Sequence, residues 1–145
     1  MDITEEQIYA LAPFAATLGI RFPTLTPDRV QAVLPTTHEL STLGGGLHGG
    51  AVMSVCDVAS AVCVALNVDE GCVWSTAEST TYFLRPVRST ATATSIPLKI
   101  GRTLATVRTE VHDDAHALCA HTTQMVHISR PAGLTADEVP HQVQP

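Results

Sequence analysis

One short segment combines free backbone donors with an out-of-place carboxylate. A glycine-rich stretch, LGGGLHGG, runs from Leu43 to Gly50, and an apolar run of helical length follows whose single charge is Asp57. A glycine-rich turn that opens a helix presents unpaired N–H groups, which can bind a negatively charged oxygen. A carboxylate within an apolar helix lacks water and is destabilising unless it is paired or functional. An oxyanion site together with a carboxylate indicates acyl-transfer chemistry.

Each half of this pattern also has a purely structural interpretation. His48, Gly49 and Gly50 could simply form a turn and start a helix, and Asp57 could be held by a hydroxyl of the core. In the functional interpretation, apolar neighbours favour the protonated form of Asp57 and hydrogen-bond donors favour the carboxylate. A group balanced between those influences suits a general base or a nucleophile.

The composition limits the class of protein. A chain of 145 residues predicts one domain with a real core, and because aromatic residues make up only 4%, that core must consist of Val, Ala, Leu and Ile. A net charge of -6 argues against a nucleic-acid or anionic-membrane partner. The N-terminus lacks the basic start and apolar stretch of a signal peptide, and the four cysteines form no C-x-x-C pair. We therefore expect buried thiols in a reducing cytoplasm.

The elements that must position the chemistry follow from periodicity and turn residues. A capping box at Thr4–Gln7 predicts a helix over about residues 5–12, and the apolar run predicts a helix over about 49–67. Strands are predicted in six segments: 18–25, 29–34, 73–84, 90–100, 103–112 and 117–128. We expect one domain over residues 1–128 and a mobile tail over residues 129–145, which contain three prolines and little apolar content.

One long helix and about six strands, mostly connected by hairpins, predict an α+β fold in which an antiparallel sheet wraps around the helix. A sheet covers a helix on one side only, and this helix is apolar all round, so its other flank should meet a second copy of the chain. Gly49 and Asp57 are also eight residues apart, roughly 12 Å along a helix, which is too far to serve one carbonyl. Two antiparallel helices in a homodimer, or in a dimer of dimers, would bring one of each together.

The loop and helix resemble the hotdog-fold acyl-CoA thioesterases. The shared motif is Gly45-x-x-His48-Gly49-Gly50 with Asp57 nine residues after the histidine, and the resemblance continues through residues 81–86 (TYFLRP) and 101–105 (GRTLA). It covers about residues 15–128 and is greatest to the phenylacetate-degradation type, which is related to one group of 4-hydroxybenzoyl-CoA thioesterases. The resemblance implies hydrolysis of an acyl- or aroyl-CoA thioester to the free acid and CoA, without a metal or redox cofactor.

The resemblance also implies roles for individual residues. The Gly49 N–H would polarise the thioester carbonyl, Asp57 would activate water or attack as nucleophile, and His48 and Gly50 would shape the binding loop. Ser75 matches a position that holds a water-orienting hydroxyl in related enzymes. Six residues before the histidine, such enzymes often carry Asn or Gln, and this chain has Thr42. The second oxyanion donor that the resemblance implies would therefore have to come from a shorter hydroxyl side chain.

Two further groups of residues have competing interpretations. Ser75 shares a predicted strand face with other small residues, Ala77, Ser79 and Thr81, so it could serve packing only. The segment 85–108 contains no acidic residue and five basic ones: Arg85, Arg88, Lys99, Arg102 and Arg108. These side chains could bind the phosphates of CoA. Alternatively, they could be ordinary solvated residues at strand ends. Among these, Arg85, Arg88 and Arg102 are the predicted substrate contacts.

Other chemistry is less well supported by the sequence. Four histidines near Cys119 have no recognised ligand spacing, so we expect surface side chains and no metal site at His112, His116, His121 and His127. A hotdog dehydratase or hydratase would need a different arrangement of His and Asp or Glu. A non-catalytic acyl-CoA binding protein remains the other alternative, because of the departure at Thr42.

Overall fold

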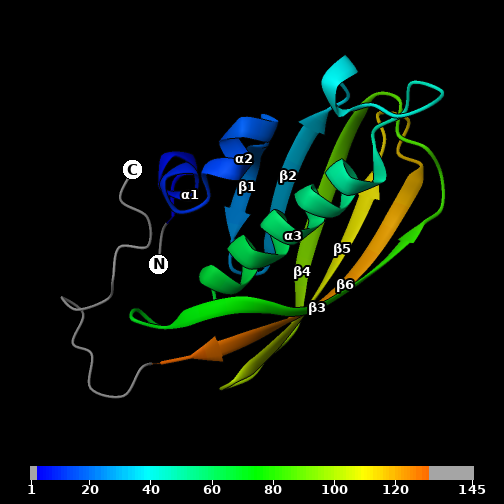
Figure 1. The fold of residues 1–145 in the computed structure, drawn as a ribbon. Coiled ribbons are helices and arrows are strands. Elements are labelled where there is room, and N and C mark those ends of the chain that lie inside the picture. Colours follow the sequence, from blue (N-terminus) through cyan, green and yellow to red (C-terminus); the bar gives the residue numbers. More distant parts are fainter. Residues whose placement is uncertain (1–2, 131–145) are drawn as a thin grey trace.

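The apolar run after the glycines forms the long helix α3 (Gly49–Ala65), and most of its side chains are buried. In this computed structural model, which describes residues 3–130, the helix lies across one face of a curved sheet (Figure 1). Small side chains such as Ala, Ser and Cys allow the helix to approach the sheet closely. The helix ends two residues before the predicted position, at Ala65.

Six strands form the sheet, and every neighbouring pair is antiparallel. The spatial order is β1-β2-β4-β5-β6-β3, so β1 and β3 are the two edges. The strand bounds are Arg21–Thr26 (β1), Arg29–Pro35 (β2), Val73–Phe83 (β3), Thr90–Ile100 (β4), Leu104–His112 (β5) and Leu118–Ser129 (β6). The predicted antiparallel sheet around one central helix is confirmed.

The core lies between α3 and the inward face of the central strands. Along β5, the side chains alternate between buried and half-buried, with Ala105, Val107 and Val111 fully buried beneath the helix. The core also contains hydroxyls that satisfy one another: Thr109 Oγ1 lies 2.9 Å from Ser60 Oγ and 2.6 Å from Ser95 Oγ. Buried polar groups are tolerated here because each has a partner.

The N-terminal region differs from the prediction in one element. Helix α1 (Glu5–Leu11) begins with the predicted capping box at Thr4, but a second helix, α2 (Pro13–Leu18), occupies part of the region before β1. Pro13 is preorganised for a first helical turn, and Gly19 ends the helix with a positive φ of 79°. The strand expected from residue 18 therefore begins only at Arg21.

Two other segments contain more regular structure than the sequence predicted. A short 3-10 helix, η1 (His38–Leu40), forms within the predicted loop. The last strand, β6, continues to Ser129, the first residue of the expected tail, and residues 131–145 of that tail lie outside the described residues. Within residues 3–130, none of the helices has the length and apolar character required to cross a membrane.

The edge strand β3 is exposed along most of its length, on both faces. Large apolar side chains are exposed at its end and on the neighbouring flank of α3, namely Tyr82 (61%), Phe83 (55%), Leu84 (54%) and Met53 (44%). This is the flank of the helix that the sheet leaves uncovered, and β3 borders it (Figure 1).

Candidate active site

The glycine-rich loop is a tight turn closed by backbone hydrogen bonds. The Thr42 N–H donates to the Gly46 carbonyl at 2.8 Å, and the Gly45 N–H donates to the Thr42 carbonyl at 3.0 Å. Gly44 and Gly45 have φ values of 86° and 75°, a region that favours glycine over any residue with a Cβ. Thr42 thus frames the loop through its backbone, and its side chain is exposed.

The start of α3 leaves one backbone donor free. His48 is the N-cap, and its Nδ1 accepts a hydrogen bond from the Gly50 N–H at 2.9 Å. The proton of the neutral imidazole therefore lies on Nε2, at an exposed side chain. Among residues 3–130, no oxygen accepts a hydrogen bond from the Gly49 N–H. Gly50 is thus engaged in the cap, and Gly49 carries the available donor.

A pocket of about 300 Å³ opens beside Gly49. Phe83 forms one wall, since a Cβ added at Gly49 would lie only 3.4 Å from the Phe83 ring, and Arg85 contributes the one charged group of the lining. The remaining lining is largely apolar and includes Leu47, Val52, Leu84, Val87 and Ala120. An apolar pocket with one backbone donor and one cation suits an uncharged acyl group whose carbonyl is polarised.

Asp57 is exposed in the single chain, contrary to the expectation of a carboxylate shut away from water. The reason is that the sheet covers only the opposite side of α3. Its Oδ1 accepts two hydrogen bonds, from Thr76 Oγ1 at 2.8 Å and from Gln124 Nε2 at 2.9 Å. Neither partner was among the predicted site residues. The alternation of β6 gives a partial signal for Gln124, because it places this long polar side chain in the inward phase together with Thr122.

The hydroxyl beside Asp57 is that of Thr76 and not of Ser75. Ser75 pairs with the exposed His127, on the face of the sheet turned away from α3, whereas Thr76 pairs with the buried Val126. The register of β3 shifts between Thr76 and Glu78, a bulge that the sequence did not reveal. The predicted single face of Ser75, Ala77, Ser79 and Thr81 is therefore wrong, because the extra residue reverses the alternation.

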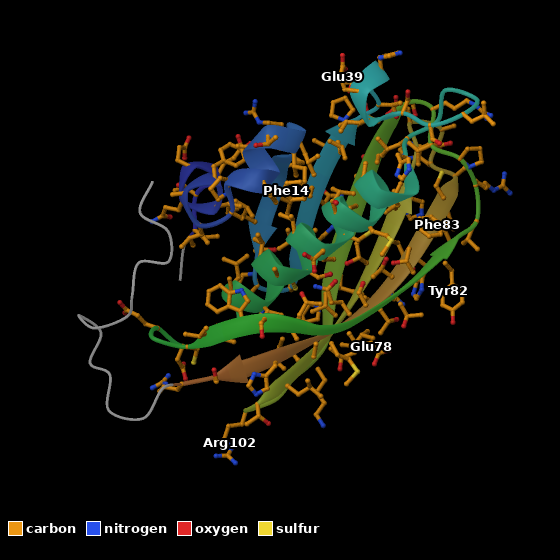
Figure 2. The ribbon with its side chains drawn as sticks, viewed as in Figure 1. Phe14, Glu39, Glu78, Tyr82, Phe83 and Arg102 are labelled. Carbon is orange, nitrogen blue, oxygen red and sulfur yellow. The ribbon has the colours of Figure 1, made fainter. Side chains whose placement is uncertain are left out.

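The predicted arginines do not gather in one place. Arg85 lines the pocket, and Arg88 Nε donates to the Gly44 carbonyl at 3.3 Å, so both lie at the glycine loop. Arg102 lies at the opposite end of the sheet from Phe83 and the pocket (Figure 2). Within one chain it is not among the residues that line the pocket beside Gly49.

The donor and the carboxylate are likewise separated within one chain. Gly49 and Asp57 lie on one helix, eight residues and thus roughly 12 Å apart, and Asp57 is not part of the pocket lining. A single chain therefore offers a free backbone donor at a pocket and a carboxylate on the exposed flank, without a position that both can reach.

Three of the four cysteines are poorly suited to act as an alternative nucleophile. Burial raises the pKa of the Cys56 and Cys63 thiols to about 11, and burial also raises the pKa of Cys119, which lines the pocket. Thiols with raised pKa values stay protonated at neutral pH and are poor nucleophiles. In the part of the chain that the structure describes, no three His, Cys, Asp or Glu side chains are arranged to hold a metal ion.

Comparison with known proteins decides the family. The model of the thioesterase superfamily matches residues 44–120, more than half of the chain, and these residues include the glycine loop, α3 and the β3 edge. The chain belongs to the thioesterase superfamily. The predicted hotdog fold of these thioesterases is confirmed by the sheet order around α3 and by the solved structures that share it.

Individual thioesterase relatives are similar over most of the chain. A Deinococcus radiodurans protein named "Putative esterase" is 35% identical over 100 residues, which make up 68% of this chain and 66% of that protein, slightly less than two thirds of its length. A thioesterase family protein from Silicibacter pomeroyi is 27% identical with a TM-score of 0.81, over 87% of this chain and 96% of that chain. A thioesterase from Haemophilus influenzae has the same fold, with 23% identity and a TM-score of 0.83 over 90% and 93%.

Proposed function

We propose that this protein hydrolyses an acyl- or aroyl-CoA thioester to the free acid and CoA. The observation that carries the proposal is the free N–H of Gly49 at the start of α3, in a residue that lines a largely apolar pocket. A thioester carbonyl placed there would accept that hydrogen bond, and the donor would be worth most as negative charge develops on the oxygen. Membership of the thioesterase superfamily supports the same reaction class.

The active unit we propose is a homodimer, alone or as half of a dimer of dimers. The β3 edge has unpaired backbone groups and borders exposed Met53, Phe83 and Leu84, a surface that a second copy would cover. With the two α3 helices antiparallel across a two-fold axis, Gly49 of each protomer would share a site with Asp57 of the other. The separation of these groups within one chain is then a consequence of the assembly.

In this site, Asp57 acts as general base or as nucleophile. As base, its carboxylate takes a proton from water while the water oxygen attacks the thioester carbon; the C–S bond then breaks and CoA leaves as the thiolate or thiol. As nucleophile, the carboxylate attacks the thioester carbon, the C–S bond breaks and CoA leaves as the thiolate, which gives a mixed anhydride. Water then hydrolyses this anhydride to the free acid and regenerates the Asp57 carboxylate. His48 caps the donor helix, and Arg85 at the pocket is placed to attract a phosphate of CoA.

A substrate panel tests the proposal directly. Release of free thiol from at least one of a set of straight-chain, branched and aromatic acyl-CoA compounds should occur with the purified protein and fall at least about a hundredfold with Asp57→Asn. If the ligands bind without any thiol release, the chain is a non-catalytic acyl-CoA binding protein and the proposed reaction is wrong.

A further inference from the structure

We propose that Gln124 is a positioning residue for the Asp57 carboxylate, an inference that rests on the proposed function. Gln124 lies on β6, under the exposed flank of α3, and is completely buried. Its Nε2 lies 2.9 Å from Asp57 Oδ1, 3.1 Å from Thr76 Oγ1 and 3.5 Å from the Asp57 carbonyl. One buried amide thus joins a side chain of the helix to a side chain of the edge strand.

The chemistry of the partners fixes the orientation of this amide. A carboxylate can only accept hydrogen bonds, so the group that faces Asp57 Oδ1 must be the NH₂ of Gln124. Thr76 donates its own proton to the same Oδ1 at 2.8 Å. Two donors therefore hold one oxygen of the carboxylate, and within residues 3–130 the other oxygen, Oδ2, accepts none. The reactive oxygen is thereby defined as Oδ2.

This orientation of the Gln124 amide leaves its other polar atom, Oε1, without a hydrogen bond within residues 3–130, which costs stability. It directs Gln124 Oε1 into the interior, where it has no hydrogen-bond partner in the described part of the chain. A buried acceptor without a partner loses its hydration without compensation. The inward neighbours of Gln124 along β6 are Val126, which is apolar, and Thr122, whose hydroxyl is already hydrogen-bonded to Thr81 Oγ1 at 2.9 Å. An amide that carries this cost and donates to Asp57 indicates a role in the site rather than in stability.

The role predicts a loss of turnover without a loss of stability. Gln124→Met removes the donor at nearly the same volume. We expect kcat for the best thioester substrate to fall about tenfold to a hundredfold, because a carboxylate free to rotate spends little time in the reactive geometry. KM should stay within about twofold, and Tm should not decrease.

A double variant distinguishes positioning of Asp57 from a general effect on the protein. If Gln124 acts through Asp57, then adding Gln124→Met to Asp57→Asn should change the residual kcat by less than about twofold. A full further loss in that background, or an unchanged kcat for Gln124→Met alone, would overturn the proposal. The positions Thr76 and Thr80 supply a second test should Gln124→Met fold poorly.

Thr76→Val removes the other donor and should lower kcat, whereas Thr76→Ser retains the hydroxyl and should restore it. Thr80 is the matched control on the same strand: its hydroxyl donates to Glu78, away from Asp57, so Thr80→Val should leave kcat unchanged. Equal effects of Thr76→Val and Thr80→Val would contradict the inference. Failure of the proposed function is distinct from this, since the wild-type protein would then release no thiol or Asp57→Asn would keep its activity.

Discussion

At the scale of single residues, the two oxygens of Asp57 stand in different environments. Oδ1 is held by Thr76 and Gln124, while Oδ2 accepts no hydrogen bond within residues 3–130 and belongs to an exposed side chain. Asparagine can preserve the first arrangement, because its own Oδ1 accepts the same two hydrogen bonds. The substitution therefore removes the charge and the proton acceptor and leaves the neighbouring contacts in place.

Asp57→Asn should accordingly lower kcat by at least about a hundredfold with an unchanged circular dichroism spectrum and a similar Tm. Thiol release measured at saturating substrate is the direct assay. Turnover within a few-fold of the wild type would show that Asp57 is structural and that the mechanism proposed here is wrong.

Arg85 and Arg102 form a matched pair for testing recognition of CoA. Arg85 lines the pocket, and Arg102 lies at the far end of the sheet in the same chain. Arg85→Glu should raise KM for CoA thioesters about tenfold and leave short thioesters without the nucleotide nearly unaffected, since only CoA carries phosphates. An equal rise for both substrate types would remove the phosphate contact. A comparable effect of Arg102→Glu would mean that the partner chain supplies that residue.

At the scale of elements, the glycine loop determines where the Gly49 donor points. Gly45 and Gly71 have similar positive φ values, 75° and 80°, and neither would bring an added Cβ within 4 Å of another atom. Alanine at either position should therefore cost a similar roughly 1–2 kcal/mol of backbone strain. Only Gly45 belongs to the loop that is closed through Thr42.

Gly45→Ala and Gly71→Ala should thus lower Tm by similar amounts, while only Gly45→Ala lowers kcat/KM, by about tenfold, as the donor shifts from its position. Thermal unfolding and thiol release on the two variants measure both effects. Equal activities for the two variants would mean that the loop geometry does not control the reaction.

The elements also show what the sequence could and could not predict. The capping box at Thr4, the helix that starts at Gly49 and the strand predicted over residues 103–112 follow from local signals, and the structure confirms all three. The bulge after Thr76 and the contact of Gln124 with Asp57 depend on pairing between segments far apart in the chain. No local pattern encodes such pairing. The sequence therefore predicted the hydroxyl of Ser75, whereas the hydroxyl that binds the Asp57 carboxylate belongs to the next residue, Thr76.

At the scale of the whole molecule, the two halves of the proposed site do not meet within one chain. The pocket and the Gly49 donor lie at the start of α3, and Asp57 lies about two helical turns further along it. A dimer with antiparallel helices would place one half from each protomer at either end of the interface. Each dimer would then have two equivalent sites, and each site would need both chains.

This arrangement predicts recovery of activity from two inactive variants. Gly49→Pro removes the donor at the first helical position, where proline is tolerated, and His48 already has the extended ψ of 140° that a following proline prefers. Asp57→Asn removes the base. In a mixed dimer, one site carries both lesions and the other carries none.

Co-folding the two variants in equal amounts should restore about a quarter of the wild-type activity, since about half of the dimers are mixed and each has one intact site. Each variant folded alone supplies the baseline, and matching circular dichroism spectra confirm that proline at position 49 is accommodated. Mixed dimers isolated with two different affinity tags should have half of the wild-type turnover per dimer. If such dimers are inactive, Gly49 and Asp57 do not act across the interface, and the site must form within one chain.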